Sequence, residues 1–157
     1  MSRSQFTTHR PGDALPAFRV REATPQDNAA LLALDRECVV AAATPVAFDR
    51  SPDFFARSRP YSTWRAYVAE GDSGLIGVGA MALKSVLVGG RPVQAAYFYD
   101  LSGCFGLWDY SPVMRMRILQ AAREWTWGTG CDLQLELGGA RGISIGSRPV
   151  FVDPADL

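Results

Sequence analysis

Residues 95–137 read AAYFYDLSGCFGLWDYSPVMRMRILQAAREWTWGTGCDLQLEL, and this stretch decides the fold of the chain. It predicts a strand, a loop, an amphipathic helix that begins at Ser111, a turn at Gly128 and a second strand. A strand that leads through a helix into another strand forms a βαβ unit, in which the two strands run parallel. The loop and the helix N-terminus of such a unit often bind anions in α/β proteins, so this loop is the first place to look for a ligand.

The predicted helix and the strand after it each have one apolar side. Ser111 and Pro112 suit the N-cap and the first helical position. In residues 131–137 apolar and polar residues alternate, which is typical of a strand covered on one face only. A second copy of the chain or a further domain is a candidate to cover that strand. The helix residues expected to be buried are Met114, Ile118, Ala121, Ala122 and Trp125.

Upstream of this unit, alternation and turn signals predict an antiparallel meander. Thr24 and Pro25 mark the start of a helix that runs to about residue 42, and the Ser-Pro-Asp sequence at 51–53 marks a second, short helix. A Gly-Gly pair at 89–90 is a hairpin signal, and the glycines at 77 and 79 permit a bend or bulge in the strand before it. The expected strands are residues 17–22, 64–70, 75–88 and 91–103.

The two ends of the chain are expected to depart from this pattern. Residues 1–16 are polar and predict a flexible tail. The remaining residues, 17–157, are short enough for one domain. Residues 138–157 are rich in glycine and predict at most one more short strand, at 149–152, with neither a helix nor a two-strand hairpin. This last part of the domain is therefore expected to be atypical or incomplete.

Composition narrows the possible functions. The formal net charge is zero and there is no basic stripe, so nucleic acid is not an expected partner. No apolar run approaches the roughly 18 residues of a membrane span, and the N-terminus lacks the apolar core of a secretory signal. Three isolated cysteines suggest a reducing compartment, and hence a cytoplasmic protein.

The only histidine is His9, in the polar tail. This argues against a zinc site, and against a Ser–His or Cys–His nucleophile in the core. Any chemistry would have to use carboxylates, tyrosines, hydroxyls, backbone amides or a bound cofactor.

The order of predicted elements resembles the GNAT superfamily of acyl-CoA-dependent N-acyltransferases over residues 17–137. Three segments carry the resemblance: FRVREATPQD (18–27), VAEGDSGLIGVGAMAL (68–83) and YDLSG (99–103). The resemblance implies an α/β (α+β) fold with a mixed sheet, in which an antiparallel meander is followed by a βαβ crossover with splayed parallel strands. It also implies acetyl-CoA or another acyl-CoA as co-substrate, and no metal.

The cofactor motif of the family is an L-x-V segment followed by P-x-x-R-x-x-G-x-G/A at the start of the third long helix. Its glycines let backbone N–H groups close on the diphosphate of the cofactor. In this chain Pro112 lies between the two glycine positions and has no N–H to donate. No tyrosine follows Tyr110, although the family usually has a tyrosine general acid after the fifth strand. Leu101 matches the motif, and the residues at its other positions are Gly103 for valine, Phe105 for proline, Trp108 for arginine, and Ser111 and Val113 for the two glycines.

Asp100 is the candidate catalytic base, because it interrupts an apolar strand immediately before the loop. The alternative is an acid bonded to loop amides or to an arginine. Strand parity places Tyr97, Tyr99 and Leu101 together on one face, lining a cleft or forming core.

The candidate cofactor-binding residues lie on both sides of the loop. The backbone of Leu101, Ser102 and Gly103 could contact the acyl carbonyl if the two parallel strands splay. Two arginines in the first turns of the helix would oppose its dipole unless an anion binds there; the alternative is that they extend into solvent. The candidates for the remainder of the cofactor are Tyr110, Ser111, Val113, Arg115 and Arg117.

The leading hypothesis is therefore an N-acyltransferase that moves an acetyl or other acyl group from acyl-CoA directly to a primary amine. The acceptor would be a small molecule or a peptide, and a carboxylate or water would take the proton. The alternative is a non-catalytic GNAT-like binding or interaction module that has lost acyl-CoA binding, which the changed loop motif favours.

Overall fold

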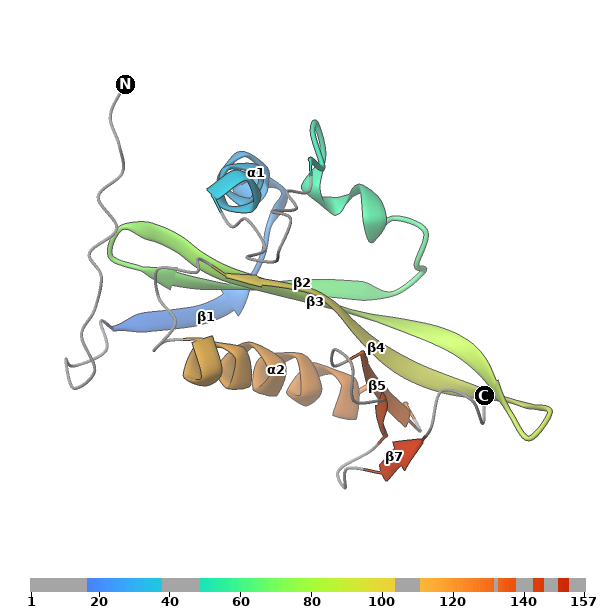
Figure 1. The fold of residues 1–157 in the computed structure, drawn as a ribbon. Helices are drawn as coiled ribbons and strands as arrows, with labels where there is room; N and C mark the ends of the chain where they lie inside the picture. The colour runs from blue at the N-terminus through green and yellow to red at the C-terminus, as the bar shows by residue number, and fades with distance from the viewer. Residues whose placement is uncertain are drawn as a thin grey trace, which may run out of the picture.

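The computed structural model describes residues 17–37, 49–103, 111–131, 133–137, 143–145 and 150–152. Within these ranges the chain forms one seven-stranded sheet with the strands in sequence order, flanked by helices on both faces (Figure 1). The elements are β1 (Phe18–Glu22), η1 (Pro25–Asp27), α1 (Asn28–Glu37), η2 (Phe54–Arg57), β2 (Trp64–Gly71), β3 (Gly74–Val88), β4 (Arg91–Gly103), α2 (Ser111–Trp127), β5 (Leu133–Leu137), β6 (Ile143–Ile145) and β7 (Val150–Val152).

The predicted meander and crossover are both present. Strands β1 to β4 are antiparallel neighbours, and β4 pairs in parallel with β5, which it reaches through α2. The mixed α/β fold class predicted from the sequence is therefore confirmed. Part of the predicted first helix, residues 38–42, lies outside the described residues, as does the predicted tail at 1–16.

The prediction that no hairpin follows Leu137 is wrong. Strand β6 pairs antiparallel with β5, and β7 pairs antiparallel with β6. Each of these two strands has only three residues, too few for an alternating pattern to stand out among glycines. They extend the sheet from the edge of β5, and that pairing is a tertiary effect that local sequence does not reveal.

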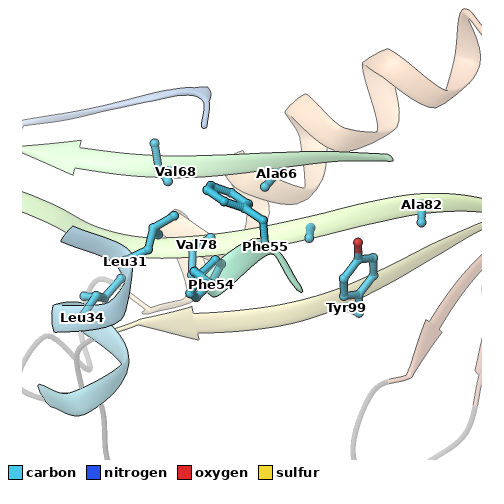
Figure 2. Packing of buried hydrophobic residues seen from close by; sticks show 10 residues of the cluster. Leu31, Leu34, Phe54, Phe55, Ala66, Val68, Val78, Ala82 and Tyr99 are labelled. Carbon is cyan, nitrogen blue, oxygen red and sulfur yellow. The ribbon is translucent and has the colours of Figure 1, made fainter. Parts of the chain in front are cut away.

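The sheet separates two apolar layers. On one face α1 and η2 cover a cluster in which the rings of Phe54 and Phe55 meet edge to face at 5.6 Å (Figure 2). On the other face α2 covers a second cluster. The buried members of the first are Leu31, Leu34, Phe54, Phe55, Ala66, Val68, Val78, Ala80, Ala82 and Tyr99; those of the second are Tyr67, Ala69, Met81, Ala96, Phe98, Met114, Ile118, Leu119 and Ala122.

Helix α2 packs very close to the sheet because glycines lie beneath it. A Cβ atom built on Gly77 would lie 2.5 Å from Sδ of Met114, and one on Gly103 would lie 2.5 Å from Cε of the same side chain. A Cβ on Gly79 would lie 2.8 Å from Cγ2 of Ile118. The expected bulges do occur beside the β3 glycines, but the larger role of these glycines is to leave room for the helix.

The buried side of α2 is turned about the helix axis from the one that the sequence predicted. Met114, Ile118 and Ala122 are buried as expected, but Leu119 and Thr126 are buried in place of Ala121 and Trp125. Ala121 and Trp125 are only partly buried, at the margin of the second cluster.

Substituting Gly79 by alanine should destabilise the fold by about 1–3 kcal/mol, because the new methyl group meets the buried side chains of Ile118 and Phe98. Gly77→Ala should cost less, since the end of the Met114 side chain can move. Gly71→Ala is the control, because its Cβ would meet its nearest neighbour at an ordinary 3.7 Å. Urea unfolding measures all three, and a Gly79→Ala variant as stable as the Gly71→Ala variant would contradict this packing.

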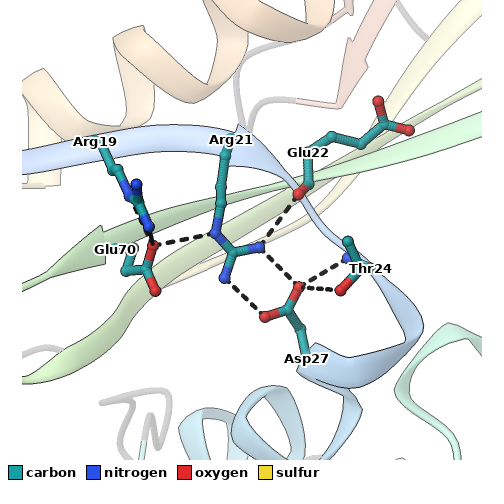
Figure 3. Close-up of polar contacts among 6 residues, drawn as sticks. All are labelled: Arg19, Arg21, Glu22, Thr24, Asp27 and Glu70. Carbon is teal, nitrogen blue, oxygen red and sulfur yellow. Dashed lines mark hydrogen bonds and ion pairs between the residues drawn. The ribbon is translucent and has the colours of Figure 1, made fainter.

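The junction between β1 and α1 is held by a group of charged side chains (Figure 3). Arg21 binds the carboxylate of Asp27 through two hydrogen bonds of 2.8 Å each. The backbone N–H of Thr24 donates to the same carboxylate at 2.7 Å. Glu70 on β2 accepts from Arg21 and from Arg19. The start signal at Thr24 thus begins the helical segment as predicted, and the charges fix its direction relative to the sheet.

The Arg21 guanidinium holds the pKa of Asp27 well below its usual value near 3.8. The stabilisation from the ionised Asp27 carboxylate is therefore complete above about pH 3.8 and is lost progressively as the pH falls below that value. Asp27→Asn should cost about 1.5–3 kcal/mol at pH 7, as expected for hydrogen bonds to a charged group, and progressively less below pH 4.

Glu22→Gln is the matched control, because its ion pair with Arg65 joins two side chains that are 49% and 43% exposed. Exposed pairs contribute about 1 kcal/mol or less. The measurement is the free energy of unfolding of each variant from pH 7 to pH 2.5. If the loss of unfolding free energy in Asp27→Asn stayed constant over this pH range, the ionised Asp27 carboxylate would not be the source of the stabilisation.

Candidate functional site

The candidate site lies where β4 and β5 separate. Their pairing runs from Ala95 opposite Leu133 to Phe98 opposite Glu136, whereas β4 continues to Gly103. Directly beyond the last pair, one residue of β3 lies opposite two residues of β4, which is a bulge. The backbone of Leu101–Gly103 pairs with β3 on one edge and with no described strand on the other.

Asp100 forms this bulge in the left-handed conformation, with φ at 54°. Few residues other than glycine adopt that conformation, and aspartate and asparagine are among those that tolerate it. Because the bulge adds one residue to β4, the side chains after it point to the opposite face from the one that simple alternation predicts. Leu101 consequently packs in the second apolar cluster, while Tyr97 and Tyr99 belong to the first. The prediction that these three side chains share a face is therefore wrong for Leu101.

The Asp100 carboxylate is buried among arginines, with 2% of its side chain exposed. Its Oδ1 lies 2.6 Å from Nη1 of Arg57 and 3.3 Å from Nη2 of Arg50. This arrangement matches the alternative reading of the sequence, an acid bonded to an arginine. Its role as a base remains a prediction, but its Oδ1 already accepts hydrogen bonds from two guanidinium groups.

A second carboxylate extends this cluster toward α1. Asp35 is only 5% exposed and lies 3.3 Å from Nη1 of Arg50. Burial raises the pKa of Asp35, the Arg50 charge acts in the opposite direction, and the charge of Asp100 raises it further. Arg50 therefore bridges carboxylates from α1 and β4, and so ties the helix to the bulge.

Beside the bulge, three tyrosines form a column on the α1 face of the sheet. The rings of Tyr97 and Tyr99 are stacked at 5.4 Å, and Tyr61 lies 5.5 Å from Tyr99. The hydroxyl of Tyr99 is 2.8 Å from the hydroxyl of Ser58, and burial raises the pKa of Tyr99 to about 12. Two cations contact the column: Lys84 Nζ is 4.3 Å from the centre of the Tyr97 ring, and Cζ of Arg57 is 5.5 Å from that of Tyr99.

The candidate cofactor residues of α2 whose side chains are described are all exposed. Val113 is 41% exposed, and Arg115 is exposed as well. The guanidinium of Arg117 lies 5.3 Å from the ring of Phe18 on β1, so this side chain rests on the sheet rather than extending freely into solvent. Tyr110, like the rest of the loop at 104–110, lies outside the described residues, and of Ser111 only the place in the helix is described.

Sequence reasoning missed several members of this site. Arg50 and Arg57 are 50 and 43 residues from Asp100 along the chain, and no local spacing links them. Lys84 is the only lysine of the chain, and no sequence motif around it indicated a functional role. Asp35 did give a signal that could have been read, because a charged residue four positions after Leu31 interrupts the apolar stripe of α1.

Two other kinds of site find no support in the part of the chain that the structure describes. None of its groups of His, Cys, Asp and Glu side chains could hold a metal ion. None of its helices is both long and apolar enough to cross a membrane.

Asp100→Ala should destabilise the fold by about 3 kcal/mol, because it removes the shared partner of Arg50 and Arg57 and leaves alanine in a left-handed conformation. Asp100→Asn tolerates that conformation and should be more stable than the alanine variant by about 1 kcal/mol. Urea unfolding of both variants measures this difference. Equal stabilities would show that the left-handed bulge is not a constraint on residue 100.

The fold was compared with known proteins. No model of a protein family matches the chain, and no curated protein matches its sequence. Several solved structures share the fold. A GNAT family acetyltransferase from Brucella melitensis, solved in complex with acetyl-CoA, is 18% identical, with a TM-score of 0.57 over 78% of this chain and 76% of that chain.

Two further structures are similar at 14% identity. Glucosamine-6-phosphate N-acetyltransferase from Arabidopsis thaliana has a TM-score of 0.54 over 79% of this chain and 84% of its own. A transcriptional regulator from Bacillus halodurans has a TM-score of 0.58 over 79% of this chain and 83% of its own. At these identities the likeness concerns the fold. The chain therefore has the fold of the GNAT superfamily, as its sequence pattern predicted.

Proposed function

We propose that the chain is an acyl-CoA-dependent N-acyltransferase that moves an acetyl or other acyl group directly to a primary amine of a small molecule or peptide. The observation that carries the proposal is the divergence of β4 from β5 directly before the bulge at Asp100. It leaves one backbone edge of Leu101–Gly103 without a described strand partner, next to the end of β4 that leads to α2. Backbone N–H groups on such an edge can donate hydrogen bonds to the acyl carbonyl.

The position of α2 supports the proposed binding of acyl-CoA, the acyl donor. Met114 packs directly on Gly77 and Gly103, so the first turns of the helix lie against the end of β4. A diphosphate at this helix end would meet unpaired backbone N–H groups and the positive end of the helix dipole. Arg115 and Arg117 belong to the same turns and would add charge. The similarity to a GNAT acetyltransferase that binds acetyl-CoA supports the same donor.

The proposed reaction needs little chemistry from side chains. The amine nitrogen attacks the thioester carbonyl, the carbon–nitrogen bond forms, and the carbon–sulfur bond breaks to release CoA. The amine loses one proton, which ends on the CoA thiolate or in solvent. Holding two reactants in line can provide much of such a rate enhancement. Backbone N–H groups near Leu101 would stabilise the oxyanion formed on the way.

Water fits the role of proton acceptor better than Asp100 does. The carboxylate is 2% exposed and hydrogen-bonded to Arg50 and Arg57, so an amine could reach it only after those contacts opened. Its contacts suit a positioning role, in which Asp100 keeps the bulge in shape and thereby orients the amides that follow.

The alternative function is a GNAT-like binding module that has lost acyl-CoA binding. The observation that favours it is in the sequence: Trp108 and Pro112 occupy positions where the family has an arginine and a residue with a free N–H. The two functions differ in whether CoA binds.

Acetyl-CoA should stabilise the protein against thermal unfolding. At about 100 times its dissociation constant, a ligand bound only by the native state adds roughly 2.7 kcal/mol. Arg115→Ala should weaken this binding, because it removes a cation from the first turns of α2. Arg91→Ala removes an exposed arginine from the distant β3–β4 hairpin and should leave binding unchanged.

Isothermal titration with acetyl-CoA and with CoA gives the affinities, and release of free thiol in the presence of excess amine gives the activity. Absence of binding at millimolar CoA would overturn the transferase and favour the binding module. Binding without thiol release for any amine would restrict the function to CoA recognition.

A further inference from the structure

The β3–β4 hairpin extends beyond the ends of α2 and η2 as a two-stranded arm, residues 84–94 (Figure 1). On one side β2 begins at Trp64, which lies opposite Ala82, and on the other side β5 begins at Leu133, opposite Ala95. None of the described strands pairs with either edge of the arm beyond these points. A hairpin of two strands is only marginally stable in water, so a third strand would stabilise the arm.

The two edges of the arm differ in their ability to pair. The N–H of Leu83 donates to the carbonyl of Thr63 at 2.9 Å, so it points away from β4. Because backbone groups alternate along a strand, the N–H and C=O groups of Ser85 and Leu87 also point away from β4. On the other edge, the residue opposite Leu87 is Pro92, which has no N–H to donate. Proline commonly protects a strand edge, so the β3 edge is the one better suited to pairing.

The open edge of β3 carries exposed apolar side chains. Leu87 is 73% exposed and Val88 is 50% exposed, although both lie within a strand. The nearest charge along β3 is that of Lys84, whose ammonium group lies over the ring of Tyr97. Residues 85–88 read SVLV and contain neither a proline nor a charge that would oppose pairing with another strand.

The open part of this edge is complementary to itself in length. It begins at Lys84, directly after the residue bound by Thr63, and ends at Val88, directly before the Gly89–Gly90 turn. Its middle residue is Val86, so two arms paired antiparallel about Val86 would cover each other's open edge from end to end. The turn leaves room for the end of the partner's β2, since no atom lies within 4 Å of a Cβ built on either glycine.

The same register also matches hydrogen-bonding groups and charges. It places Ser85 opposite the partner's Leu87, and both present N–H and C=O groups outward, so each such pair can exchange both of its hydrogen bonds. Val86 meets the partner's Val86 in a pair without hydrogen bonds, the kind in which side chains lie closest. Lys84 lies opposite the partner's Val88, so the two lysines stay about 13 Å apart along the strands.

From this arrangement we infer that residues 84–88 of β3 form the interface of a homodimer, in which two copies of the chain join their sheets by antiparallel pairing of the arms. The inference goes beyond the proposed function and does not depend on acyl-CoA binding. A short strand is a small contact beside the roughly 20–30 residues a side of a standard interface. The dimer should therefore be reversible and should form as the protein concentration rises.

Sedimentation velocity over a range of protein concentrations tests the inference, and Ser85→Pro should raise the dissociation constant of the dimer at least roughly tenfold. Each copy of that variant loses an N–H that bonds across the interface. The variant should fold, since Pro92 already occupies an outward position of this arm. Gln94→Pro is the matched control: Gln94 lies opposite Ser85, so the proline removes an outward N–H from the other edge and should leave the dissociation constant unchanged.

Val86→Cys gives a second measurement that does not require the proline variants to fold. Opposite residues in a pair without hydrogen bonds have Cα atoms about 4.5 Å apart, which a disulfide can span. Mild oxidation should therefore link two copies of this variant, and the parent chain with its native cysteines gives the background. A parent chain that stays monomeric at every concentration would overturn the dimer in favour of a strand from another protein. A dimer that neither weakens in Ser85→Pro nor links in Val86→Cys would overturn this interface.

Discussion

The structure depends on the direct contact between α2 and a strip of glycines on β3 and β4. Side chains at Gly77, Gly79 or Gly103 would occupy the space that Met114 and Ile118 fill. The contact lets a single helix cover the second apolar cluster on one face of the meander. It also sets where the helix begins, and therefore where the crossover from β4 to β5 can present an anion site. The packing of α2 and the position of the proposed donor site thus depend on the same few missing side chains.

Asp100 connects the two faces of the sheet in a different way. Its left-handed conformation shifts the register of β4, so that Tyr97 and Tyr99 face α1 whereas Leu101 faces α2. Its carboxylate meanwhile joins Arg57 from the η2 segment and Arg50, which in turn reaches Asp35 on α1. The candidate base is thus also the point at which the geometry of β4 and a buried charge cluster meet.

Local sequence signals were sufficient for most of the fold. The Thr24–Pro25 start, the Gly89–Gly90 turn and the alternation along the strands each act within a few residues, and each predicted the right element. The hairpin of β6 and β7 could not be predicted in this way, because three-residue strands depend on pairing with β5 rather than on their own pattern.

The candidate site was predictable only along β4. The sequence placed Asp100 and the residues after it at the end of a strand, which is where they lie. It could not supply Arg50, Arg57 or Lys84, since these meet Asp100 and Tyr97 through folding of distant segments. The glycines of β3 permitted a bulge, but the sequence could not place its extra residue at Asp100, because aspartate enters the left-handed conformation only when its surroundings compensate for the strain.

The division of the core has a consequence for how the chain folds during synthesis. Every residue of the first apolar cluster lies between Ala23 and Tyr99, so the whole cluster has been translated before α2 begins. The four antiparallel strands and α1 can close around it while the opposite face of the sheet is still bare. Until Met114 and its neighbours leave the ribosome, that bare face, with Met81 and Phe98 at its centre, is the part of the nascent chain that a chaperone has reason to shield.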